Sequence, residues 1–155
     1  QIMGDWAKGE FTAAGKTPGV DYYCAATPSN NGYLYNVDSF IFYKSSDPDK
    51  QAGQKLLAKL MMGKNFQKVF NLYKGSIPAR LDVSMDEFDK CAKTSNADIK
   101  TAGAKGGLVP SFAHGMAQGN TMKAALQDII TEHFNSDMSS VDAANALADS
   151  VLANM

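Results

Sequence analysis

The sequence lacks the features that mark several broad classes of protein. It has no apolar run near the ~20 residues that a membrane-spanning helix requires. Its 15 basic and 16 acidic residues give a net charge of -1 and form no basic cluster, so nucleic acid is not expected as a partner. Internal repeats and low-complexity tracts are absent. No charged and then apolar leader precedes Gln1, so we expect that any targeting segment was removed or never included.

Cysteine is scarce. Cys24 and Cys91 are far apart, form no CxxC motif, and are too few for a zinc site. We predict neither a metal nor a cofactor. In an oxidising compartment the two residues would pair as one disulfide, whereas otherwise they would be buried free thiols. The residues alone leave both alternatives open.

Catalytic signatures are also missing. Ser111 is not part of a GxSxG elbow, and no oriented acid accompanies it. Asp86, Glu87 and Asp89 are typical of a solvated face and not of a pair of catalytic carboxylates. The sequence therefore gives no reason to expect an enzyme.

The composition of the 155 residues, 45% hydrophobic and 20% charged, is that of one globular domain able to bury a core. A mixed α/β chain is predicted. Strands are expected at Ile2–Met3, over residues 20–26 and over residues 33–43, with a turn at 29–32 between the last two.

The stretch from Asn71 to Arg80 follows a helix whose apolar residues recur at helical spacing: Phe66, Val69, Phe70 and Tyr73. Gly75 is suited to a left-handed cap, and Pro78 prevents the helix from resuming. Lys74 then lies at the helix end, where the helix dipole favours its charge. It is either a hydrogen-bond donor to a ligand or a solvated lysine.

Further helices are marked by their caps. Ser46-Asp47-Pro48 predicts a helix start, followed by a buried face of Leu56, Leu57, Leu60 and Met61 and a break at Gly63. Short helices are expected over residues 81–105. Two final helices should begin at Asn120 and at a capping box of Ser139 and Asp142.

Three further side chains are candidates for a binding site. Trp6, the single tryptophan, is either a core anchor or a platform for a flat apolar ligand face. Asp38 interrupts an apolar run, so its carboxylate must be paired, hydrated or turned to a cleft, unless it merely ends a strand. His114, beside Gly115, either presents its ring to a cleft or is structural.

The order of four motifs adds to this interpretation. Met-Gly-Asp-Trp at 3–6, Asn-Val-Asp-Ser-Phe at 36–40, Lys-Gly-Ser-Ile-Pro-Ala-Arg at 74–80 and Val-Pro-Ser-Phe-Ala-His-Gly at 109–115 follow one another. This series resembles the C-terminal portion of periplasmic sugar-binding proteins, the solute-binding components of ABC importers. The likeness is strongest to the glucose/mannose-binding proteins, and it extends over nearly the whole chain.

The resemblance implies a periplasmic-binding-protein type II fold, an α/β and helix-rich architecture. Residues 1–155 would be the C-terminal segment of a bilobal protein, contributing to both lobes, with the N-terminal half absent. Trp6 would stack on a pyranose ring in the cleft between the lobes. Asp38, Lys74 and His114 would bond its hydroxyls. The family also suggests a disulfide between Cys24 and Cys91, consistent with a periplasmic location.

The partners implied by the resemblance are a monosaccharide, glucose or else mannose or galactose, and the membrane subunits of an ABC permease. Two alternatives remain. A glycosidase fragment would need a second carboxylate at a defined distance from Asp38, and the sequence offers no convincing one. The other alternative is a structural or interaction domain without a sugar site.

Overall fold

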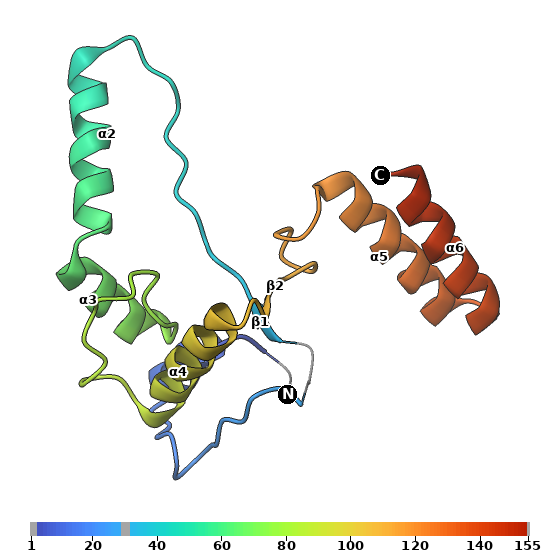
Figure 1. The fold of residues 1–155 in the computed structure, drawn as a ribbon, viewed down its shortest axis with the longest axis horizontal. Coiled ribbons are helices and arrows are strands. Elements are labelled where there is room, and N and C mark those ends of the chain that lie inside the picture. Colours follow the sequence, from blue (N-terminus) through green and yellow to red (C-terminus); the bar gives the residue numbers. More distant parts are fainter. Residues whose placement is uncertain (1–2, 29–31, 155) are drawn as a thin grey trace. The chain divides into compact units, whose positions relative to one another are not determined.

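The computed structural model describes residues 3–28 and 32–154 (Figure 1). They divide into two compact units. Unit 1 comprises Gln1–Tyr33 and Asp38–Leu108, and unit 2 comprises Leu34–Val37 and Val109–Met155. Helices dominate both, as the resemblance led us to expect, and two short strands, β1 (Tyr33–Tyr35) and β2 (Leu108–Pro110), pair in a two-stranded sheet.

Unit 1 contains four helices: α1 (Ala7–Ala13), α2 (Pro48–Met61), α3 (Lys64–Lys74) and α4 (Lys90–Ala104). The predicted start of α2 is confirmed, because the Asp47 side chain accepts hydrogen bonds from the first-turn amides. The break at Gly63 is confirmed too, since α3 begins directly after it. So is the end of α3, where Gly75 adopts a left-handed φ of 84° that favours glycine.

The short helices predicted over residues 81–105 are in fact one helix, α4, after a turn-rich stretch. The Asp89 carboxylate accepts a hydrogen bond of 2.8 Å from the Ala92 amide and so caps its start. From there the sequence is rich in alanine and lysine and contains no proline, so nothing interrupts the helix before Lys105.

Unit 2 contains α5 (Asn120–Asn135) and α6 (Ser140–Ala153), which pack against each other along their length (Figure 1). The predicted capping box is confirmed: the Asp142 amide donates to Ser139 Oγ, which donates in turn to the Asp142 carboxylate. The predicted cap at Asn120 was wrong by one residue. Gly119 precedes the helix, and Asn120 is its first residue.

The strand predictions were mostly wrong within the described residues. Met3 lies outside any strand and is 54% exposed, residues 20–26 form a loop, and only β1 remains of the run 33–43. Ile2 and residues 29–31 lie outside the described part of the chain. A strand is stable only when it hydrogen-bonds to a neighbour, and sequence pattern does not supply the neighbour.

The apolar core of the described residues is small. Its buried hydrophobic members are Met61, Val83, Phe88, Ala92, Met122 and Ala143. The predicted buried face of α2 was therefore wrong except at Met61: Leu56, Leu57 and Leu60 are 70%, 47% and 59% exposed. No described helix has the length and apolar character needed to span a membrane.

Candidate functional site

An ion pair joins two of the candidate residues. Lys74, the last residue of α3, donates through Nζ to the carboxylate of Asp38. Its ammonium also lies 5.8 Å from the centre of the Phe70 ring, within the range of a cation–π interaction. The end of α3 thus carries the Lys74 ammonium next to the carboxylate of Asp38, which lies in the segment 36–45 outside any helix or strand.

This pair has the chemistry of a site for hydroxyl groups. An ammonium has three donor hydrogens and a carboxylate has about four acceptor positions, so each group can serve more than one partner. The Lys74 side chain is 31% exposed and that of Asp38 is 62% exposed, so both are accessible. An exposed pair of this kind contributes little to stability.

Trp6 directly precedes α1 and is half-buried. A Cβ atom placed on Gly4 would lie only 1.9 Å from Cζ3 of the indole, so the backbone at Gly4 packs directly on the ring. Glycine at this position therefore does more than permit a turn, because a residue without a side chain leaves room for the indole ring.

A close contact between α1 and the end of α3 links the elements that carry Trp6 and Lys74. A Cβ on Gly9 would lie 2.7 Å from the Lys74 carbonyl oxygen, and one on Gly75 would lie 2.5 Å from the Gly9 nitrogen. The two backbones touch where neither residue has a side chain. Two isolated glycines carry no signal that they meet, so sequence reasoning missed this contact.

His114 belongs to unit 2 and lies in the loop that follows β2. Its Nδ1 atom is 2.7 Å from the hydroxyl oxygen of Ser111, which is 3% exposed. This hydrogen bond between a buried hydroxyl and an exposed imidazole orients the ring, and the tautomer of His114 decides which group donates. Of the four predicted sugar contacts, the structure thus joins Asp38 to Lys74 and places Trp6 directly before α1, the helix that contacts the end of α3, while His114 belongs to unit 2.

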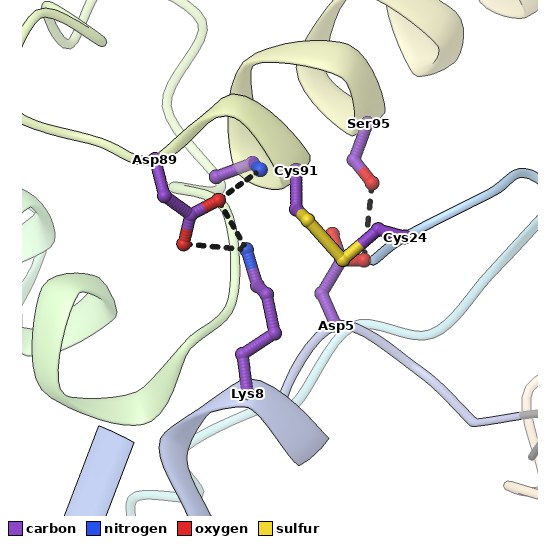
Figure 2. The surroundings of a disulfide bond; sticks show 7 residues. Asp5, Lys8, Cys24, Asp89, Cys91 and Ser95 are labelled. Carbon is purple, nitrogen blue, oxygen red and sulfur yellow. Dashed lines mark hydrogen bonds and ion pairs between the residues drawn. A yellow bond between two sulfur atoms is a disulfide. The ribbon is translucent and has the colours of Figure 1, made fainter. Parts of the chain in front are cut away.

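Cys24 and Cys91 form a disulfide, as the resemblance suggested, so the alternative of two free thiols is excluded (Figure 2). The bond fastens the loop after α1 to the first turn of α4. A crosslink between residues 67 positions apart restricts the unfolded chain substantially.

Polar contacts that sequence reasoning missed surround the disulfide (Figure 2). Lys8 Nζ lies 3.3 and 3.4 Å from the two carboxylate oxygens of Asp89, and the Ser95 hydroxyl donates to Asp5 at 3.0 Å. Lys8 is only 5% exposed. The prediction that Asp89 lies on a solvated face was therefore wrong: it caps α4 and neutralises a buried ammonium.

Burial also changes the titration of this region. Desolvation raises the pKa of Asp5 above its ordinary value, although the hydrogen bond from Ser95 and the charge of Lys8 oppose the change. Burial likewise raises the pKa of Tyr33, and a hydrogen bond with Ser95 again opposes the effect. Ser95 therefore serves two partially desolvated groups.

Within the part of the chain that the structure describes, no group of three or more metal-ligating side chains occurs. Two shallow hollows with almost entirely apolar linings run along α2 and α3, and Lys74 lies at the end of one of them beside Phe70 and Tyr73. The described site therefore combines charged groups with an aromatic and aliphatic surface.

Comparison with known proteins adds a family context, although no protein-family model matches the chain. The chain is 45% identical over 152 residues to a probable sugar-binding periplasmic protein of Brucella suis, and 41% identical over 152 residues to one of Rhizobium meliloti. Each match covers 97% of this chain and 36% of the relative. The chain is similar to one part of periplasmic sugar-binding proteins.

A more distant relative points the same way. An uncharacterized ABC transporter extracellular-binding protein of Pyrococcus horikoshii is 37% identical over 132 residues, which is 84% of this chain and 29% of that protein. The chain therefore spans about a third of the length of the curated relatives it matches.

Proposed function

We propose that the chain is the C-terminal segment of a two-lobed periplasmic solute-binding protein with the type II fold, and that it supplies part of a monosaccharide site. The observation that carries the proposal is the ion pair of Asp38 and Lys74 at the end of α3, next to the helix that follows Trp6. The similarity to sugar-binding proteins over 97% of the chain supports it.

The chemistry of a pyranose suits these groups. A sugar has hydroxyls that both donate and accept, around a ring whose C–H faces are apolar. The Asp38 carboxylate accepts, the Lys74 ammonium donates, and the His114 imidazole does either according to its tautomer. The Trp6 indole covers one face of the ring. Each of these four roles follows from the resemblance and from the chemistry of the side chain.

Binding without chemistry follows from the same set of groups. Asp38 is engaged by a lysine, whereas glycoside hydrolysis requires two carboxylates across the scissile bond. We propose that the sugar stabilises a closed arrangement of two lobes, which an ABC permease recognises. A periplasmic location agrees with the names of the relatives and with the disulfide.

Calorimetric titration with D-glucose, D-mannose and D-galactose tests the proposal. It is made on the 155-residue chain and on the complete protein, meaning this chain with any further residues of its natural sequence. We expect stoichiometric binding of at least one sugar to the complete protein. Absence of binding of all three would overturn the monosaccharide proposal, and turnover of an aryl glycoside would replace it with the glycosidase alternative.

A matched pair of lysine variants tests the site itself. Lys74→Ala removes the ammonium that we propose binds the sugar. Lys68→Ala removes another ammonium of the same helix, one that pairs with Glu87. We expect Lys74→Ala to weaken sugar binding by roughly tenfold to a hundredfold, the effect of losing a charged hydrogen bond. Lys68→Ala should leave affinity unchanged. Equal affinities of the two variants would remove Lys74 from the site and favour a structural or interaction domain.

A further inference from the structure

We infer that Asp5, Lys8, Asp89 and Ser95, none of which is a proposed sugar ligand, are positioning residues that hold the Trp6 indole in place and thereby set sugar affinity. The inference rests on the proposed function and deepens it. The four residues form two polar links between the start of α1 and α4, called here the α1–α4 clamp.

The two links of the clamp lie on opposite sides of Trp6 in the sequence. Asp5, one residue before Trp6, accepts the hydrogen bond from Ser95, and Lys8, two residues after it, pairs with Asp89. Both partners belong to one rigid element, since Asp89 caps α4 and Ser95 lies within it. The backbone that carries the indole is therefore fixed at two points to the same helix (Figure 2).

Glycine contacts restrain the same segment from other directions. Gly4 packs on the indole, and Gly9 packs on Gly75 at the end of α3. Because the carbonyl of Lys74 touches Gly9, a displacement of α1 would also change the distance between the indole and the Lys74 backbone. A binding site loses affinity when groups that must act together are loosely supported, even if every ligand group remains present.

The clamp is more than an ordinary surface contact. Lys8 is 5% exposed, and its ammonium needs a charged or polar partner at that depth. The disulfide fastens a second segment, the loop after α1, to the same helix α4, so the helix that holds the clamp partners is also held covalently. An aromatic platform on such a support can be held in one orientation before the sugar arrives, which lowers the entropic cost of binding.

The test follows the Trp6 ring directly in the complete protein labelled with 5-fluorotryptophan. The fluorine resonance of Trp6 is assigned by its disappearance in Trp6→Phe. The clamp variants are Ser95→Ala and Lys8→Met, and Ser95→Thr retains the hydroxyl. Lys68→Met is the control, because it breaks an ion pair of the same type between α3 and Glu87, outside the clamp. Each protein is measured by fluorine NMR, by calorimetry with D-glucose, D-mannose and D-galactose, and by thermal unfolding.

We expect Ser95→Ala and Lys8→Met to shift or broaden the Trp6 resonance and to weaken sugar binding by roughly tenfold, a loss of the size of one ordinary hydrogen bond or more. Ser95→Thr should restore both readouts, and Lys68→Met should change neither. Ser95→Ala removes one hydroxyl only, so it retains a measurable fold if Lys8→Met unfolds.

Two results would overturn the inference. The first is a lowered melting temperature with an unchanged Trp6 resonance and unchanged affinity, which would assign the clamp a purely structural role. The second is a disturbed Trp6 resonance in a protein that binds sugar as tightly as the unaltered one. If the unaltered protein binds none of the three sugars, the proposed function fails and the effect on affinity fails with it, while the resonance still decides whether the clamp positions Trp6.

Discussion

Two regions of unit 1 are held together in different ways. Around α1 and α4, a disulfide, a buried ion pair and the hydrogen bond from Ser95 to Asp5 join segments that are far apart in sequence. Along α2 and the segment that precedes it, large apolar side chains are exposed instead, with Ile41 at 77% and Leu56 at 70%. The first region is stabilised by contacts within the chain, and the second leaves apolar surface uncovered.

The difference bears on how the proposed site is built. The region that carries Trp6 and touches the end of α3 has its own covalent and polar support. In the second region every residue from Phe40 to Tyr43 is an exposed large apolar side chain, and further ones follow on α2. Contiguous apolar surface of this kind commonly marks a contact with another part of a protein or with a partner. This agrees with the proposal that the chain is one segment of a larger protein whose remaining part covers them. The following predictions would break or sharpen this comparison.

Loss of the disulfide should have the largest effect. We expect the double variant Cys24→Ala and Cys91→Ala to lose about 4 kcal/mol of unfolding free energy, because the bond closes a loop between residues 67 positions apart. Urea unfolding with and without a reducing agent measures the change. The agent should destabilise the unaltered protein and leave the double variant as it is; an unaltered protein that resists fully confirmed reduction would contradict the prediction.

The buried ion pair should come next. Lys8→Ala leaves the Asp89 carboxylate, whose side chain is 31% exposed, without its ammonium partner, and we expect a loss of about 2 kcal/mol. Lys50→Ala is the matched change in the second region, where both partners are exposed at 73% and 45%. It should cost less than about 0.5 kcal/mol. Urea unfolding measures both changes. Similar losses of unfolding free energy for the two variants would contradict the proposed difference between the two regions.

Replacement of an exposed leucine of α2 should affect stability differently in the 155-residue chain and in the complete protein. In the 155-residue chain, Leu56→Gln should change stability by less than about 0.5 kcal/mol, because the side chain is 70% exposed. It should also reduce self-association and the binding of an apolar dye. In the complete protein the same change should destabilise by about 2 kcal/mol, if the remaining part buries this leucine.

Sedimentation equilibrium and urea unfolding of both forms measure these effects. Leu152→Gln on α6, which is 72% exposed, is the control for a leucine outside this region. A monomeric 155-residue chain with little dye binding would contradict the view that another part of the protein normally covers the apolar side chains along α2. If Leu56→Gln leaves the stability of the complete protein unchanged, the remaining part of that protein covers a surface other than the one around Leu56.

Helix ends were predictable from the sequence, whereas strands and the clamp were not. Asp47, Gly75 and Ser139 act through hydrogen bonds or dihedral angles within a few residues, so the local sequence contains the whole signal. A strand depends on a neighbour, and Lys8 meets Asp89 across 81 residues. No periodicity encodes a contact of that range.

The candidate site shows the same division. The position of Lys74 at a helix end could be derived from Gly75 and Pro78, and the structure confirms it. Its contact with Asp38, 36 residues away, was not predicted from spacing. The roles of Trp6 and His114 came from the resemblance and stay predictions, because a tryptophan or histidine alone is compatible with a core, a surface or a ligand.

The smallest predicted effect concerns pH and the clamp. Because burial raises the pKa of Asp5 in the folded protein, the folded state binds more protons than the unfolded state above the ordinary value of 3.8. Stability contributed by this group is therefore complete below that value and is lost as the pH rises through the folded pKa. Asp5→Asn removes this dependence and retains an oxygen that accepts the hydrogen bond from Ser95.

Relative to the unaltered protein, Asp5→Asn should therefore gain stability as the pH rises from about 4 towards neutrality, by less than about 1 kcal/mol. Urea unfolding at a series of pH values measures the difference. A difference that falls with pH would mean that the attraction of Lys8 outweighs the desolvation of Asp5, and the two links of the clamp would then be coupled by charge as well as by geometry.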